Sequence, residues 1–94
     1  MKYYLYIIKT LDDKLYCGIT TNVLRRFDEH LHSKLGAKYL RAHKPKEIVL
    51  VMEFEDKSSA LKEEYRIKKT LTRQEKLELV LENQEFTKNY LSNA

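Results

Sequence analysis

The scarcity of chain-breaking residues constrains this sequence more than any other feature. Gly18, Gly36 and Pro45 are the only glycine and proline residues among 94. Since these two residue types most readily interrupt helices and strands, long stretches should form regular elements joined by short turns. A chain of this length has room for one hydrophobic core. With no repeat or linker to divide it, we expect a single domain over residues 1–84 and a frayed polar tail at 85–94.

Local signals predict a β-hairpin and a helix in the first half of the chain. β-Branched and aromatic residues favour strands, and they fill the segments on both sides of the polar turn at 11–14. Thr20, Thr21 or Asn22 can cap the next helix, because their side chains accept hydrogen bonds from free backbone N–H groups. The expected elements are a strand at 3–9, a strand at 15–20, a helix ending near His32 and, within the connector 33–46, a short helix at 37–41.

The second half predicts one more strand and two helices. Residues 47–55 carry a nearly continuous apolar run, which is typical of a strand in the middle of a sheet. Asp56 can cap a helix over 57–70, and Thr72 with Glu75 forms the capping-box pattern that opens another helix. The resulting order is β-β-α-β-α-α. Strands covered by helices in this order predict an α+β domain.

Positive charge is concentrated in the first half. Residues 1–46 hold ten Lys or Arg against four Asp or Glu, whereas residues 47–94 hold eight against ten. The connector contributes five basic residues and one tyrosine, namely Lys34, Lys38, Tyr39, Arg41, Lys44 and Lys46. A one-sided positive field attracts polyanions, so these six residues are candidates for nucleic-acid binding. A solvated basic loop is the alternative interpretation.

Cysteine usage and hydropathy bear on where such a protein works. The single cysteine, Cys17, cannot form an internal disulfide, which favours a reducing cytoplasm. No apolar run approaches the roughly 18–20 residues that a membrane helix needs. The apolar N-terminal stretch also lacks the small-residue cleavage site of a signal peptide. We therefore expect a cytoplasmic protein without a membrane partner, and we favour a monomer.

Glu64 stands out because it falls on the apolar face of a predicted helix. Together with Ala60, Ile67 and Leu71 it follows a spacing that places all four residues on one side. A carboxylate directed toward a core is costly unless it is paired or binds a metal. Glu64 is therefore either a site residue or a residue at the edge of the stripe that pairs with an arginine or reaches water. Its neighbour Glu63 points elsewhere.

Arg26 and His30 are four residues apart on the first predicted helix, so they share a face. They could belong to a site, or they could be a surface salt bridge and a packed histidine. Arg25 lies one step around the helix and can pair with Glu29, which marks Arg25 as a surface residue.

The hairpin is rich in tyrosine. Alternate residues of a strand share a face, so Tyr6 and Tyr16 project together if the turn pairs even-numbered positions with each other. The preference of tyrosine for half-buried strands is the alternative explanation for either residue. Gly18 weakens a strand interior and often marks a bulge or a close approach.

Read in order, these residues resemble the GIY-YIG nuclease family. The matching segments are Tyr-Leu-Tyr at 4–6, Tyr-Cys-Gly at 16–18, an arginine helix at 20–30, a stretch at 36–39 typical of small stand-alone bacterial members, and a glutamate helix at 60–69. The similarity covers roughly residues 3–73. It implies a three-stranded antiparallel sheet flanked by helices.

The resemblance also implies an endonuclease that hydrolyses DNA phosphodiester bonds with one divalent ion, Mg²⁺ or Mn²⁺. By position, Glu64 would bind the metal and Arg26 would hold the scissile phosphate. Tyr16 would position or activate the attacking water with help from Tyr6, and His30 would support proton transfer. These residue types suit the reaction, because arginine offers a permanently charged fork and a divalent ion can bind one carboxylate together with water and phosphate oxygens.

The sequence departs from the family pattern in three places. Position 4 is Tyr where the family often has Gly, and position 17 is Cys rather than Ile. Many members carry an Asn downstream of the glutamate, and Asn83 is too far along the chain to match it. We expect low sequence specificity, with repair or structured DNA as the setting. The alternatives are a nucleic-acid-binding module with weak or lost catalysis and a protein-interaction domain that uses residues 77–81.

Overall fold

The computed structural model describes residues 1–32 and 36–93. Its elements, in chain order, are β1 (Tyr3–Thr10), β2 (Leu15–Thr20), α1 (Val23–His32), α2 (Lys38–Ala42), β3 (Pro45–Phe54), α3 (Lys57–Thr70), α4 (Arg73–Glu82) and α5 (Gln84–Asn93). The predicted order is confirmed, with α5 added at the end. No helix in the described ranges is both long and apolar enough to cross a membrane.

The three strands form one antiparallel sheet in the order β2-β1-β3, as predicted. The expectation that the 47–55 strand lies in the middle is wrong, because β1 holds that place and β3 is an edge strand. The apolar run of β3 has another cause. Helices pack against this edge strand, and α5 crosses it, so its apolar side chains are covered without a second neighbouring strand.

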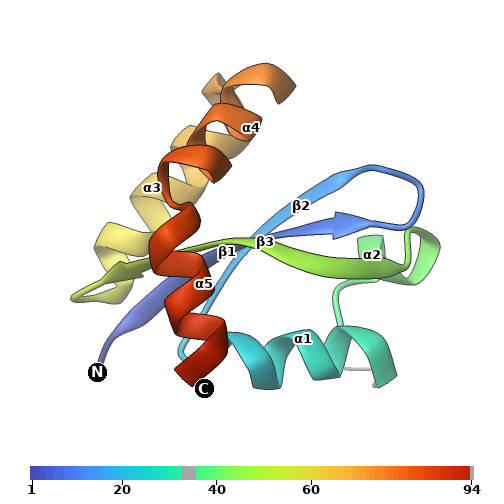
Figure 1. Cartoon of the computed structure of the whole chain (residues 1–94), viewed down its shortest axis with the longest axis horizontal. Coiled ribbons are helices and arrows are strands. Elements are labelled where there is room, and N and C mark those ends of the chain that lie inside the picture. Colours follow the sequence, from blue (N-terminus) through green and yellow to red (C-terminus); the bar gives the residue numbers. More distant parts are fainter. Residues whose placement is uncertain (33–35, 94) are drawn as a thin grey trace.

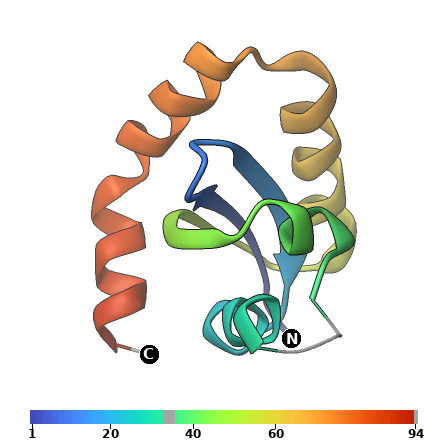
Figure 2. The same ribbon diagram turned by 90° about the vertical axis from the view of Figure 1, so that its right-hand side faces the viewer.

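Each face of the sheet has its own hydrophobic core. One core contains Leu5, Ile7, Cys17, Leu50 and Ile67, and helices α3 and α4 pack against it. The other contains Tyr6, Ile8, Val23, Leu40 and Val51 and joins the sheet to α1 and α2. Figure 2 shows α3, α4 and α5 as an arch around the sheet, with α1 below it. The alternation of side chains along β1 therefore divides its residues between two layers.

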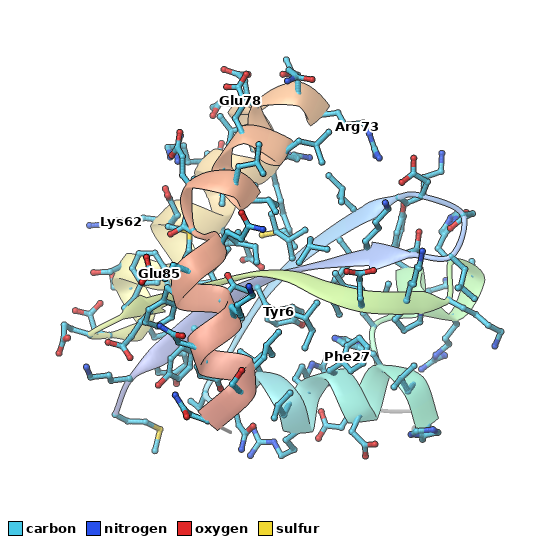
Figure 3. The ribbon with its side chains drawn as sticks, in the orientation of Figure 1. Tyr6, Phe27, Lys62, Arg73, Glu78 and Glu85 are labelled. Carbon is cyan, nitrogen blue, oxygen red and sulfur yellow. The ribbon has the colours of Figure 1, made fainter. Side chains whose placement is uncertain are left out.

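Local capping signals begin α3 and α4 where the sequence predicts. The side chain of Asp56 accepts a hydrogen bond from Ser59 N, and Thr72 and Glu75 form the complete capping box. An ion pair of 3.1 Å between Arg73 Nη2 and Asp13 Oδ2 then ties the first turn of α4 to the β1–β2 turn. Figure 3 shows Arg73 extending from α4 toward that turn. The hairpin and the helical arch are thereby fixed to each other.

The expectation of a frayed tail at 85–94 is contradicted, because residues Gln84–Asn93 form α5. Two hydroxyl groups attach this helix to the rest of the molecule. Thr87 Oγ1 accepts a 2.9 Å hydrogen bond from Val51 N at the edge of β3, and Tyr90 Oη accepts one of 3.2 Å from Val23 N at the start of α1. A polar segment is ordered here because its hydroxyls satisfy backbone groups that would otherwise lack partners.

Candidate active site

Tyr16 lies at the centre of a cluster of functional side chains drawn from five elements. Its ring centroid is 6.3 Å from that of Tyr6 and 5.6 Å from that of His30. Tyr39 stacks on Tyr16 at 6.0 Å, and Lys68 Nζ lies 5.9 Å from the Tyr16 ring centroid. The hairpin register explains the first contact, since even positions pair with even ones and both tyrosines project from one face. That sequence prediction is confirmed.

Gly18 allows Tyr6 to lie flat against β2. A Cβ atom at position 18 would lie 2.6 Å from Tyr6 Oη and 2.8 Å from Tyr6 Cζ. Gly18 is paired with Tyr6 across the two strands, so the phenol crosses directly over the glycine. The close approach expected at Gly18 is therefore made by a side chain of the same protein.

His30 holds the Tyr6 hydroxyl in a defined hydrogen-bonding state. Ala37 N donates a 3.1 Å hydrogen bond to His30 Nδ1, so this nitrogen carries no proton. The neutral ring then carries its proton on Nε2, which lies 2.9 Å from Tyr6 Oη and donates to it. The Tyr6 hydroxyl keeps its own proton for a further acceptor. Both nitrogens of His30 are occupied in this arrangement, and the residue is buried.

Burial governs the titration of this pair. Burial, and after it the charge of Arg26, lowers the pKa of His30 from 6.5 to about 4, while Glu29 acts in the opposite direction. Burial also raises the pKa of Tyr6 well above its ordinary value, with Arg26 opposing the rise. At neutral pH the cluster therefore contains an uncharged imidazole and a protonated Tyr6 phenol.

The depressed pKa of His30 predicts an acid-sensitive contribution to stability. Between pH 6.5 and about 4 the unfolded chain binds a proton at this residue and the folded chain does not. The free energy of unfolding should therefore fall as the pH drops through this window, by a few kcal/mol at about 1.4 kcal/mol per pKa unit. Urea unfolding at pH 7 and pH 4.5 measures the loss. His30→Gln should lose less unfolding free energy between the two pH values than the wild type. His32→Gln, which changes an exposed residue, should lose as much as the wild type. Equal losses in both variants would contradict the assignment of the acid sensitivity to His30.

Arg26 lies beside Tyr6 and His30, as the shared helix face predicted. Its guanidinium acts on the pKa of both residues, and its Nη1 forms a 2.9 Å ion pair with Glu29 Oε1. The expected pairing of Arg25 with Glu29 is not observed. Arg25 Nη2 instead donates to Thr21 Oγ1 at 3.4 Å, because a separation of three residues brings Arg26 and Glu29 together and Arg25 points away.

Glu64 lies at the edge of the apolar stripe, between the core and the Tyr16 cluster. Ala60 and Ile67 on the same helix face are fully buried, whereas the Glu64 side chain keeps 18% of its exposure. Its Oε2 is 3.2 Å from Lys68 Nζ, the same ammonium group that lies near the Tyr16 ring. Lys68 thus connects the carboxylate of α3 to the hairpin phenol. The paired carboxylate that the sequence left open as an alternative is present, with lysine in place of arginine.

The donor groups around Glu64 suit one kind of metal ion. Within residues 1–32 and 36–93, no three His, Cys, Asp or Glu side chains gather closely enough to form a metal cluster. Mg²⁺ commonly keeps several waters and binds one or two carboxylates together with substrate phosphates. Glu64 is a partly exposed carboxylate of this kind. The residues therefore fit an ion shared with a bound phosphate and do not fit an ion held by the protein alone.

Most of the predicted basic surface is exposed on and after α2. Lys34 lies outside the described residues. Lys38, Arg41, Lys44 and Lys46 are all exposed. Tyr39 differs from them, because it stacks on Tyr16 and also on His43 at 4.4 Å. The structure therefore brings one residue of the basic segment into the cluster and leaves the others along its flank.

Two lysines near the cluster escaped the sequence analysis. Lys68 is four residues beyond Glu64, and this spacing is a signal that an ion pair with the carboxylate could have been expected. Lys76 on α4 lines the same cavity as Tyr16 and Lys68. No local pattern points to Lys76, since its position depends on how α4 turns back over the hairpin.

Comparison with known proteins places this arrangement in a family. A model of the GIY-YIG catalytic domain matches residues 2–78. A UPF0213 protein of Cupriavidus necator is 46% identical over 74 residues, which are 79% of this chain and 79% of that protein. The UPF0213 protein YhbQ of Salmonella typhimurium is 45% identical over 84 residues, 89% of this chain and 82% of YhbQ.

A solved structure is also similar. The solution NMR structure of the UPF0213 protein BH0048 from Bacillus halodurans has a TM-score of 0.57 and 38% identity, and the match covers 89% of this chain and 87% of that one. The family model covers the hairpin, α1 and α3, the elements that carry Tyr6, Tyr16, Arg26 and Glu64. The chain therefore belongs to the GIY-YIG family of nucleases.

Proposed function

We propose that this protein is an endonuclease that hydrolyses DNA phosphodiester bonds with one divalent ion and with low sequence specificity. The convergence around Tyr16 carries the proposal. Phenols from the hairpin, a guanidinium and an imidazole from α1, and a carboxylate from α3 meet in one small region. These are the groups that phosphodiester hydrolysis requires: fixed positive charge, a metal ligand and hydroxyls able to orient water.

Arg26 would bind the phosphate that is cleaved. Its guanidinium stays charged at every accessible pH and offers two parallel donors to phosphate oxygens. The ion pair with Glu29 and the neighbouring Tyr6 hold it in the site before substrate arrives. Charge that develops on the phosphate would therefore meet a cation that needs no rearrangement.

Glu64 would hold the divalent ion through its carboxylate, and the ion would supply further positive charge to the phosphate oxygens. In the structure Lys68 Nζ forms a 3.2 Å ion pair with Oε2 of this carboxylate. Binding of the ion would therefore release the ammonium group, which then becomes available to the substrate.

Tyr16 would orient the attacking water. Its hydroxyl makes no hydrogen bond to any residue in the described part of the chain, whereas the Tyr6 hydroxyl is bound by His30. Tyr6 is fixed and protonated, so it would act as a hydrogen-bond donor toward the phosphate or the water. His30 would support proton movement only through Tyr6, because both of its nitrogens are occupied.

The basic residues of the 34–46 segment would guide the strand to the site without reading its sequence. Lys34, Lys38, Arg41, Lys44 and Lys46 would contact backbone phosphates, which carry no base information. Affinity should therefore fall steeply with salt concentration. Nicked or branched DNA, as formed during DNA repair, would be a suitable substrate for such an enzyme.

A binding module without catalysis is the second candidate, and the Lys68–Glu64 ion pair favours it. A carboxylate that keeps its lysine partner would not take a metal ion, and the fold would then only bind DNA. This candidate predicts salt-sensitive binding with no cleavage in the presence of any divalent ion.

The deciding experiment incubates the purified protein with single-stranded, nicked and branched DNA in Mg²⁺ or Mn²⁺ and follows strand scission on a denaturing gel. The proposal expects products with either ion and none in EDTA. Binding without products at any ion concentration would establish the second candidate. Absence of both cleavage and salt-sensitive binding would reject both candidates.

A further inference from the structure

A small cavity opens beside the Tyr16 cluster, between the hairpin and helices α3 and α4. Its volume is about 230 Å³. The lining consists of apolar residues from the hairpin, two tyrosines and two lysines, namely Ile7, Leu15, Tyr16, Cys17, Tyr39, Lys68 and Lys76. We call it the Lys68–Lys76 pocket. Pockets that hold drug-sized ligands are larger, at roughly 300–1,000 Å³, so this one has room for no more than one unit of a polymeric ligand.

Two ammonium groups from different helices converge on this pocket. Lys68 comes from α3 and Lys76 from α4, and both line the pocket together with Cys17. Burial, and after it the charge of Glu64, raises the pKa of the Cys17 thiol to about 12, and both ammonium groups oppose this rise. Like charges are not brought together without cost, so an anion between them would be stabilising. Glu64 neutralises Lys68 in the structure, whereas Lys76 has no ion pair with any of the described residues.

The position of Lys76 is fixed by contacts outside the pocket. The ion pair between Arg73 and Asp13 attaches the first turn of α4 to the hairpin, and Lys76 follows three residues later on the same helix. The capping box at Thr72 and Glu75 fixes the start of this turn. Lys76 is also half-buried, unlike most lysines of this protein. These contacts fix the first turn of α4 and so place Lys76 beside the pocket that it lines.

The lining combines two chemistries that occur together in a nucleotide. Tyr39 lines the pocket, and although its ring stacks on Tyr16 and His43, the residue as a whole is 42% exposed, so it keeps accessible surface that a base can contact. Bases stack on aromatic side chains with little regard to sequence, while nearby cations bind the phosphate. The two lysines disfavour a metal cation inside the pocket, and a purely apolar ligand would leave Lys76 without an ion-pair partner among the described residues.

We propose that the Lys68–Lys76 pocket binds one unpaired nucleotide of the substrate strand, with its phosphate on Lys68 and Lys76 and its base against Tyr39. The inference rests on the proposed function, because the pocket opens next to Tyr16 and Glu64. It adds a substrate class to that function. A base inside a duplex must leave its stack to enter such a pocket, so strands with an unpaired nucleotide beside the cut are preferred.

Binding in EDTA tests the pocket separately from catalysis. Fluorescence anisotropy compares a short oligothymidylate with an abasic chain that carries the same number of phosphates. Lys76→Gln should weaken binding of both ligands about three- to tenfold and reduce the salt dependence by roughly the 0.7 expected for one single-strand phosphate contact. Lys62→Gln is the matched control, because Lys62 is an exposed lysine that points outward from α3.

Tyr39→Leu tests the base contact. The wild-type protein should bind oligothymidylate at least about fivefold more tightly than the abasic chain, as the loss of one base–aromatic stack predicts. The Leu variant should lose most of that preference while its affinity for the abasic chain changes little. Circular dichroism of each variant confirms that the fold is retained.

The outcomes separate this inference from the proposed function. Equal binding by Lys76→Gln and Lys62→Gln, or a preference for oligothymidylate over the abasic chain that Tyr39→Leu leaves unchanged, would overturn the pocket assignment even if the enzyme cleaves DNA. Pocket-dependent binding in EDTA without cleavage in Mg²⁺ or Mn²⁺ would support the pocket and reject the endonuclease.

Discussion

Glu64→Gln should lower the cleavage rate by at least about 100-fold, because it removes the carboxylate that we propose holds the divalent ion. Gln has nearly the same size and can still hydrogen-bond, so the volume of the site is kept. The variant also loses the ion pair with Lys68. That pair is partly exposed, and such pairs contribute at most about 1 kcal/mol, so the folded state should persist.

Glu63 provides the matched control for this experiment. It is the preceding residue on α3, its side chain has a similar exposure of 20%, and it pairs with Arg66 instead of Lys68. Glu63→Gln should cleave at nearly the wild-type rate. Single-turnover rates with saturating protein compare the chemical step in the three proteins. If both variants keep wild-type rates, or lose them equally, Glu64 has no special role and the metal assignment is wrong.

The parts of the fold that depend on local patterns could be predicted from the sequence. The parity of Tyr6 and Tyr16 sets which face they share, and the structure confirms the register on which that prediction depended. The capping box at Thr72 and Glu75 is present as expected. The helical spacing put Glu64 on the apolar face of α3, and the structure shows it at the edge of that face, which was one of the two alternatives. Each of these features is decided by neighbours within one element or one turn.

The parts that depend on contacts between distant segments could not be predicted in this way. The apolar run of β3 does not reveal that the strand lies at an edge and that α5 covers it. The sequence after Gln84 is polar and therefore reads as a tail. The helix is ordered because the hydroxyls of Thr87 and Tyr90 bond backbone groups of β3 and α1, which lie far away in the sequence. Lys76 reaches the site only because α4 turns back over the hairpin. Periodicity carries no information about such long-range contacts.

Arg26→Lys should lower the cleavage rate by about 100- to 1,000-fold, comparable to the loss of one fixed donor to a developing oxyanion. Lysine keeps the positive charge but cannot offer two parallel donors, and its shorter reach from α1 moves the charge away from Tyr6. The effect should appear in kcat more than in KM, because the interaction strengthens as charge develops on the phosphate. Rates in saturating Mg²⁺ measure it.

Arg25→Lys is the control that makes the Arg26 result interpretable. Arg25 is the preceding residue of α1, carries the same charge and points away from the site toward Thr21. Both substitutions leave net charge unchanged, so long-range attraction of DNA is equal in the two variants. A difference in kcat between them can then come only from the local arrangement of the guanidinium beside Tyr6 and His30. Equal rates would mean that Arg26 attracts DNA without taking part in the reaction. The guanidinium would then no longer count among the groups that act on the phosphate.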